Sequence, residues 1–194
     1  MERVESGWRP VSIEKAIEIG YTSPISKTLY DQLMKIAPSI SCGLEYRPCQ
    51  ATLENGEVYD RVYFVTPYRY ISCWGIWPED DKGKRSISIK DVKHIRESPY
   101  RLPAEFANRL YEAEQNIKDG YMFKLSLADG RKLLFAMVGT VDFPNIPPDI
   151  DMNQVVDAVP YQGEDFVDRA PKENETGADY YWCIYLPPIG ISEP

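Results

Sequence analysis

The sequence has little of the chemistry from which common catalytic and metal sites are built. It contains one histidine, and its four cysteines include no CxxC pair, so the ligand spacings of zinc sites are missing. Neither a P-loop nor a G-x-G-x-x-G fingerprint after a strand is present, which leaves no visible nucleotide site. We therefore expect no metal and no cofactor, and we assign no catalytic residue.

Long apolar runs and clusters of basic residues are missing as well. Nothing approaches the roughly 18 uninterrupted apolar residues that a membrane-spanning helix needs, and no secretory core follows the charged N-terminus. The formal net charge of −8 disfavours nucleic-acid binding, which depends on clustered Lys and Arg. We therefore predict a cytoplasmic protein with reduced cysteines, without a membrane or nucleic-acid partner.

Strand and turn formers are abundant instead. The 194 residues include 14 Tyr and 16 Pro, a composition that suits strands and loops better than a helix bundle. The clearest pattern is a β-hairpin over residues 121–138, in which Asp129-Gly130 joins two apolar runs.

A weaker copy of this hairpin surrounds Asn55-Gly56, 74 residues before Asp129-Gly130. Each hairpin is followed by a closing strand, Val92–Ile95 in the first copy and Val156–Val159 in the second, at an offset of 64. This order of elements predicts a degenerate internal repeat. Chance similarity between two period-two hairpins is the alternative.

Three helices are expected from apolar residues at helical spacing. The first covers residues 12–20, where Ser12 is a suitable N-cap. The second is Pro24–Ile36, capped by Ser23. The third, Pro103–Ile117, is expected to bridge the two repeats and to pack on a sheet through one apolar face.

The remaining segments are assigned from alternation and from turn residues. Leu133–Val138 is apolar on both faces, which is typical of a central strand covered on two sides. Residues 161–179 are predicted to be loop because Pro, Gly and charged residues dominate them. Further strands are predicted at Val58–Val65, Tyr68–Trp74, Ser86–Ile89 and, as the last strand of a sheet, Tyr180–Leu186.

Together these elements predict an α+β fold that is mostly antiparallel β, with two degenerate hairpin-containing repeats, two N-terminal helices and one bridging helix. The repeats form either a mostly antiparallel sheet or a pair of small half-barrels. The hairpin with its closing strand is loosely similar to the small SH3-like and Sm-like barrels, a similarity of fold that implies no activity. A single domain, 1–194, is expected. Its segments are an N-terminal helical segment (1–41), a first β repeat (42–100), the bridging helix (101–120), a second β repeat (121–160), and an acidic loop with the C-terminal strand (161–194).

The first candidate binding site is a stretch rich in Tyr and Trp, residues 68–77. Such side chains dominate binding surfaces because they combine a large contact area with a polar group, and they also stack on sugars or bases. On a strand, alternate members would share one face, so core packing and a binding face are both open readings. The candidates are Tyr68, Arg69, Tyr70, Trp74 and Trp77.

The second candidate is an acidic span, residues 142–179, with ten acidic side chains against Arg169 and Lys172. An acidic surface attracts a basic partner over a long range, but a solvated loop explains the same composition. The candidate residues are Asp149, Asp151, Glu164 and Asp165.

Asp149 and Asp151 also resemble the first ligands of a calcium loop. Gln154 stands where such a loop requires glycine, and Pro160 stands where it requires a bidentate acid. We therefore predict no calcium site at these residues.

Three functions are consistent with these features. The first is a non-enzymatic protein-binding module for a partner of basic character, in its concrete form an acidic bacterial inhibitor of the immunity-protein kind. The alternative is a small-ligand or carbohydrate-binding module that uses the Tyr/Trp strand. The second alternative is a hydrolase in which His94 activates Cys42, Cys49 or Cys73. The oligomeric state, and whether the repeats pack within one chain or swap between two, stay open.

Overall fold

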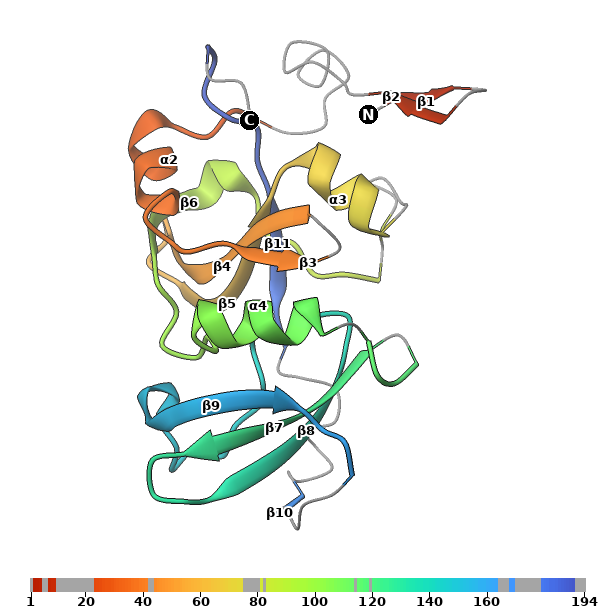
Figure 1. The fold of residues 1–194 in the computed structure, drawn as a ribbon. Helices are drawn as coiled ribbons and strands as arrows, with labels where there is room; N and C mark the ends of the chain where they lie inside the picture. The colour runs from red at the N-terminus through yellow and green to blue at the C-terminus, as the bar shows by residue number, and fades with distance from the viewer. Residues whose placement is uncertain are drawn as a thin grey trace. The chain divides into compact units, whose positions relative to one another are not determined.

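A computed structural model of the chain describes residues 2–4, 7–9, 23–41, 44–74, 81, 83–113, 115–118, 120–163, 168–169 and 179–190 (Figure 1). The fold is α+β, with mostly antiparallel strands in two main sheets and few helices. The chain forms two compact units. Unit 1 comprises Met1–Pro38, Gly43–Glu97 and Tyr180–Pro194, and unit 2 comprises Ser39–Cys42 and Ser98–Asp179.

The sheet of unit 1 is organised around β4 (Leu44–Leu53). This strand pairs antiparallel with β5 (Val58–Val65) and with β6 (Val92–Arg96). On its other edge β5 pairs with β11 (Tyr181–Ile184), which confirms the predicted C-terminal strand and places it parallel to its neighbour.

The hairpin between β4 and β5 closes through a three-residue loop, Glu54-Asn55-Gly56. The Leu53 N–H donates to Glu57 O (2.8 Å) and the Gly56 N–H donates to Leu53 O (3.0 Å). Gly56 takes a φ of 89°, in the left-handed region that glycine enters without strain. The hairpin prediction is confirmed, with one more loop residue than the expected two-residue turn.

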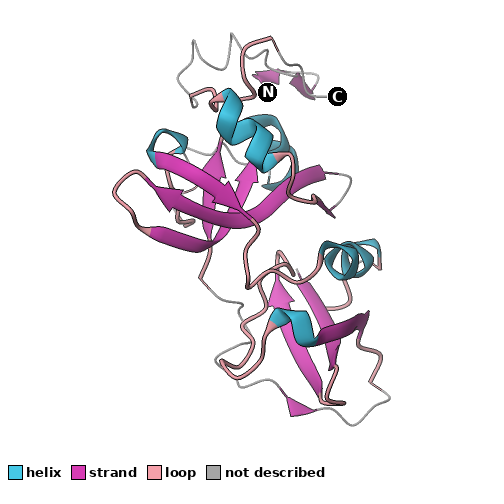
Figure 2. Cartoon of the chain, turned by 90° about the vertical axis from the view of Figure 1, so that its left-hand side faces the viewer, coloured by secondary structure: helices cyan, strands magenta, loops and turns pink. Residues whose placement is uncertain are grey.

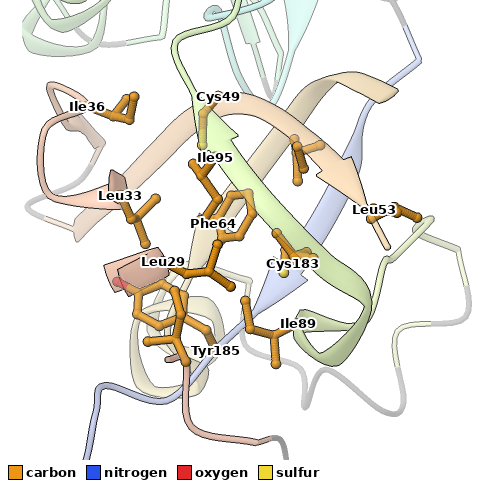
Figure 3. Packing of buried hydrophobic residues seen from close by; sticks show 14 residues of the cluster. Leu29, Leu33, Ile36, Cys49, Leu53, Phe64, Ile89, Ile95, Cys183 and Tyr185 are labelled. Atoms are coloured by element: carbon orange, nitrogen blue, oxygen red, sulfur yellow. The ribbon is translucent and has the colours of Figure 1, made fainter. Parts of the chain in front are cut away.

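Unit 1 buries its main core on the face of the sheet that we call its inner face (Figure 3). Helix α2 (Lys27–Leu33) packs there through Leu29 and Leu33. Ser26, whose Oγ accepts from the Leu29 N–H (3.2 Å), caps this helix, so it begins three residues later than predicted. The strand residues of this core include Cys49, Ala51, Leu53, Val62, Phe64, Val92, Ile95 and Cys183.

Helix α3 (Pro67–Trp74) replaces the strand predicted for the Tyr/Trp stretch, so that prediction is wrong. Pro67 occupies the first helical position, where its fixed φ and missing N–H are favourable, and the Tyr70 N–H donates to Thr66 O (2.9 Å).

The sheet of unit 2 has the strand order β10-β8-β7-β9. Its antiparallel core is the predicted hairpin β7 (Gly120–Leu127) and β8 (Lys132–Val138), with β9 (Val155–Pro160) on the other edge of β7. β10 (Asp168–Arg169) pairs parallel with β8 inside a segment predicted to be loop. Unit 2 also includes the short strand β3 (Ser39–Ser41), which is not one of the four strands of this sheet.

Helix α4 (Ala104–Glu112) covers one face of this sheet, which we call its inner face (Figure 2). The rings of Phe123 and Phe135 stack on this face, with 5.6 Å between their centroids. It contributes Phe106, Ala107, Leu110 and Tyr111 to the core. The helix ends at Glu112, whereas Ile117 was predicted, because the Asn116 amide bonds both the N–H (2.6 Å) and the C=O (2.8 Å) of Met122.

Three other expectations have different outcomes. The first predicted helix, residues 12–20, lies outside the described residues. Before it, β1 (Glu2–Val4) pairs with β2 (Gly7–Arg9), two strands that were not predicted. The strand predicted at Ser86–Ile89 is reduced to one bridge between Ser86 and Trp182, followed by the 3₁₀ turn η2 (Ile89–Asp91). Leu133–Val138 alternates between buried and less buried residues rather than being covered on both faces.

The two units share one order of elements. In each, a helix precedes a hairpin, a 3₁₀ turn (η2, or η3 at Met152–Gln154) leads into a third strand, and a fourth strand runs parallel to the second. Ala51 pairs with Ile95 in unit 1, and Leu125 pairs with Ala158 in unit 2. The fourth strand of unit 1, β11, follows unit 2 in the chain.

Candidate functional site

The outer face of the unit 1 sheet carries a cluster of aromatic rings. Trp182 stacks on Tyr63 (4.7 Å, 27° between planes), and Tyr46 meets the edge of the same pair. Tyr70 of α3 packs edge-on against Trp182 (5.5 Å), which places the helix on this face. All four rings are buried, so they form a second core rather than an open groove.

One cation and one anion complete this cluster. Lys84 Nζ lies 5.2 Å from the ring centre of Tyr70 and 2.9 Å from Asp81 Oδ2, and the Tyr70 hydroxyl donates to the same oxygen. Burial alone would raise the pKa of Asp81, but the hydrogen bonds from Tyr70 and Lys84 together lower it. The opposite charges of Lys84 and Asp81 neutralise each other, and their contacts with Tyr70 connect α3 to the segment that follows it.

The structure separates the predicted Tyr/Trp candidates. Tyr68 is 37% exposed, with the Arg69 guanidinium 5.9 Å from its ring centre. Tyr70 is buried, which removes it from any shared ligand-binding face. The side chain of Trp74 and the whole of Trp77 lie outside the described part of the chain.

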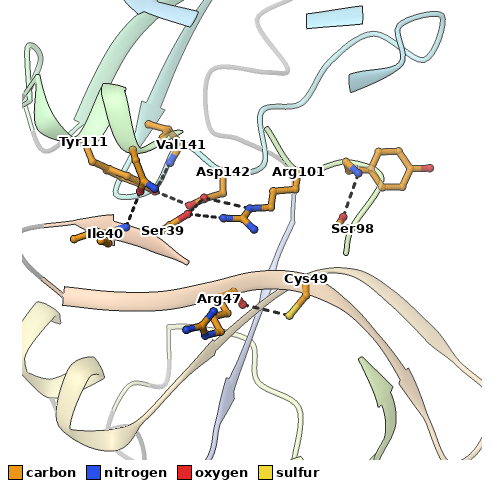
Figure 4. A network of polar contacts seen from close by, with 11 residues as sticks. Ser39, Ile40, Arg47, Cys49, Ser98, Arg101, Tyr111, Val141 and Asp142 are labelled. Atoms are coloured by element: carbon orange, nitrogen blue, oxygen red, sulfur yellow. Dashed lines mark hydrogen bonds and ion pairs between the residues drawn. The ribbon is translucent and has the colours of Figure 1, made fainter. Parts of the chain in front are cut away.

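Unit 2 holds a buried polar network around Asp142 (Figure 4). The Tyr111 hydroxyl donates to Asp142 Oδ2 (2.6 Å), and the Ser39 hydroxyl donates to Oδ1. Arg101 Nη2 donates to Ser39 Oγ (3.1 Å), and Arg101 Nε lies 3.9 Å from Asp142 Oδ1. Tyr111 also accepts from the Val141 N–H (2.9 Å).

This network joins segments far apart in the sequence, β3, the turn before α4, α4 itself and the loop after β8. Burial raises the pKa of Asp142, while Arg101, Ser39 and Tyr111 act in the opposite direction. Asp142 is fully buried, so no substrate reaches the carboxyl, and the network acts as a structural anchor. Asp142 was predicted to belong to an acidic span that is either a partner-attracting surface or a solvated loop, and its burial shows that both readings are wrong for this residue. The apolar residues beside it, Val141 and Phe143, are the sequence signal for burial.

The predicted acidic candidates do not gather into one described site. Arg131 Nη1 pairs with Asp149 (3.0 Å), and Arg131 Nε pairs with Asp129 (2.7 Å). Asp151 caps η3, where its Oδ1 accepts from the Asn153 N–H (2.8 Å). Glu164 and Asp165 lie outside the described residues.

The hydrolase alternative requires a cysteine thiol beside the imidazole of His94. Neither of the two described cysteines supports such a pair. Cys49 and Cys183 are buried in the inner core of unit 1, and burial raises the pKa of Cys183 well above its ordinary value. His94 is exposed on β6, in register with Thr52. Cys42 and the side chain of Cys73 are outside the described part of the chain.

The outer face of the unit 2 sheet carries four apolar side chains and one lysine that are half-buried. In register, Met122 lies beside Ala136, and Lys124 lies between Leu134 and Val159. These five side chains are half-buried. They alternate along the strands with core residues such as Phe123, so they lie on the face of the sheet opposite α4. At the margins Val138 is 58% exposed, and Val156, at a register shift in β9, is 56% exposed.

Within the described ranges, no three His, Cys, Asp or Glu side chains gather closely enough to hold a metal ion. None of the described helices is long and apolar enough to cross a membrane. Comparisons with protein-family models, with curated proteins and with solved structures found no match for this chain.

Proposed function

We propose that this protein is a non-enzymatic binding protein whose unit 2 associates with a basic protein partner. The observation that carries the proposal is the distribution of charge between the units. Unit 2 has 15 acidic and 8 basic residues, a formal charge of −7, whereas unit 1 has 15 and 14, a formal charge of −1. Nearly all of the net charge of −8 therefore belongs to one unit.

The excess of acidic over basic residues is greatest late in unit 2. Three of the earlier acids form ion pairs: Arg131 pairs with Asp129 and Asp149, and Arg109 Nη1 pairs with Asp157 (2.5 Å). Residues 164–179 carry six acids against two bases, which supplies −4 of the −7. A local excess of this kind attracts a basic protein and raises the rate of encounter.

The concrete form of the proposal is an inhibitor of the immunity-protein kind, which neutralises a basic toxin or nuclease in the bacterial cytoplasm. An acidic inhibitor gains affinity and speed from the opposite charge of such a target. This form predicts a partner with an excess of Lys and Arg at its contact surface.

The test compares the chain with a variant that lacks the late acidic charge, Glu164→Gln, Asp165→Asn, Glu173→Gln and Glu175→Gln. Both proteins are used as bait in lysate of the native cell, at about 50 mM and 500 mM salt, because surface electrostatics weaken strongly over this range. We expect a basic protein to be retained by the wild-type chain at low salt only. Retention of the same proteins by both baits would contradict the proposal.

We also propose that the two units are copies of one ancestral unit, with the second copy inserted before the last strand of the first. Equivalent backbone bonds support this: the Glu54 N–H donates to Asp91 O and the Ala128 N–H to Gln154 O, both at 2.8 Å. The shared strand order and the parallel fourth strands support it further. Closure of either sheet into a half-barrel stays a prediction.

A further inference from the structure

We propose that the free edge of β9 in unit 2 is blocked against strand pairing with a second copy of this chain. Among the described strands, β9 ends the order β10-β8-β7-β9, so one of its edges pairs with β7 and the other pairs with no strand. A free edge presents backbone N–H and C=O groups that attract another strand. The inference is independent of the proposed function and concerns the association state of the protein.

The backbone groups of Ala158 face this free edge and are occupied by side chains. Ala158 lies in register with Leu125 of β7, but its N–H donates to Asp157 Oδ1 (3.0 Å). In an antiparallel pair the N–H and C=O of one residue point to the same side, so both groups of Ala158 point outward. Arg109 Nη1 of α4 lies 3.5 Å from Ala158 O and 2.5 Å from Asp157 Oδ1. One ion pair therefore caps both the donor and the acceptor of Ala158.

Pro160 and a β-bulge add to the blocked edge. Pro160 follows Ala158 by two residues, so its backbone faces the same edge, where proline has no N–H to donate. At the start of β9 the register shifts, which leaves Val156 outside the regular pairing with β7. Such a bulge twists an edge away from an incoming strand. Because Val156 is 56% exposed, an unblocked β9 would offer another strand apolar contact as well as hydrogen bonds.

Unit 1 caps the corresponding position of its own closing strand with a different side chain. Ile95 of β6, in register with Ala51, donates its N–H to Gln32 Oε1 (2.9 Å). Gln32 belongs to α2, which precedes the hairpin of unit 1 as α4 precedes that of unit 2. β6 also has a register shift, which leaves the exposed Lys93 outside the pairing where unit 2 has Val156. Capping of the same strand by unrelated side chains supports a role for the capping itself.

The test opens the edge and measures self-association by sedimentation velocity from low to high micromolar concentration. The opened variant, Asp157→Thr with Pro160→Thr, frees the N–H of Ala158 and adds an N–H at position 160. The control, Asp149→Thr with Pro148→Thr, makes the same two changes at exposed residues of the turn before η3, where Asp149 also pairs with an arginine. Thermal unfolding of both variants checks that the fold is retained.

We expect the wild-type chain and the control to stay monomeric, because neither offers an edge that pairs. The opened variant should approach twice the monomer mass as its concentration rises, since two β9 strands that pair antiparallel about a two-fold axis close at the dimer. Its self-affinity should exceed that of the control at least about tenfold, because the new pairing adds backbone hydrogen bonds. Exchange of the Ala158 amide hydrogen should slow in the opened variant as the dimer forms.

Several outcomes would overturn the inference. An opened variant that stays monomeric would show that the caps are not needed. Equal self-association of the control would assign the effect to the lost charge and proline, and a wild-type dimer that protects the Ala158 amide would make this edge an interface.

A second pair of variants keeps the test decisive if the opened variant unfolds. Arg109→Ala frees the C=O of Ala158, and Arg131→Ala removes an equally half-exposed arginine from its pairs with two aspartates. Arg109→Ala should raise self-association in the same direction but less strongly, because Pro160 remains. Identical sedimentation of these two variants at every concentration would contradict the proposal.

Discussion

Removing the buried carboxylate of Asp142 should destabilise unit 2 more than any other single Asp→Ala change in the residues that we describe there. In Asp142→Ala the guanidinium of Arg101 stays buried without its counter-charge. The hydroxyls of Tyr111 and Ser39 lose their acceptor at the same time. Breaking a buried pair in this way costs roughly 3–5 kcal/mol, because the remaining charge is uncompensated.

A matched control is the exposed pair of Arg109 and Asp157, in which both side chains are nearly half exposed. Asp157→Ala removes the same group from an arginine partner, but water solvates the arginine that remains. Its cost should stay below about 1 kcal/mol. Both variants replace aspartate by alanine beside an arginine. The difference between their losses of unfolding free energy therefore measures the effect of burial of the ion pair.

Hydrogen exchange of the β7–β8 hairpin, residues 120–138, is the direct assay because it reports the opening of unit 2. A loss of 3–5 kcal/mol accelerates exchange that proceeds through unfolding by roughly a hundred- to several-thousand-fold, whereas the control should change it by at most about fivefold. The four tryptophans all belong to unit 1, so their emission follows that unit separately. Similar exchange rates in both variants would refute the structural role of the Asp142 network.

Three further predictions concern pH, backbone and thiols. Because burial raises the pKa of Asp142, protonation of this carboxyl adds a pH-dependent stabilisation, separate from the cost of removing the group. This stabilisation is fully present below the ordinary carboxyl value of about 4 and is lost as the pH rises through the folded value. Wild-type unit 2 should therefore gain unfolding free energy relative to Asp142→Asn on acidification, and an opposite trend in chemical unfolding would exclude a raised pKa. Gly130→Ala should cost about 1–2 kcal/mol in the same assay, since Gly130 has a φ of 89° and no atom that a Cβ would touch; no loss would mean that the loop relaxes. In the native state Cys49 and Cys183 should resist alkylation, as mapped by mass spectrometry, because both are buried; rapid labelling of either would contradict the packing of the unit 1 core.

Local patterns predicted the parts of the fold that local physics determines. The hairpins at Asn55-Gly56 and Asp129-Gly130 follow from alternating apolar residues and from a glycine that accepts a positive φ. The faces of α2 and α4 follow from apolar residues at steps of three and four, and the buried Leu29, Leu33 and Leu110 confirm them.

The errors occurred where a local pattern has two meanings. Pro67 both ends a strand and starts a helix, and the β-branched and aromatic residues after it favoured the strand. Packing of Tyr70 on Trp182, more than a hundred residues later, favours the helix, and no local pattern contains that contact. The parallel pairing of β11 with β5 is long-range in the same way.

The candidate site was less predictable than the fold. The Asp142 network combines side chains from four separate segments, and Asp142 itself has the same identity as the solvated acids that follow it. The concentration of acidic charge in unit 2 depends on the boundaries of the two units, which the sequence alone does not indicate.

The most direct test of the central claim is the association rate of the chain with the basic protein that it retains from lysate, measured at increasing ionic strength. If the late acidic residues of unit 2 steer the encounter, the rate constant should fall about tenfold or more between low and high salt. In the variant that lacks the charges of Glu164, Asp165, Glu173 and Glu175, the rate should be low and nearly independent of salt. Equal rates and equal salt dependence for the two proteins would contradict the account.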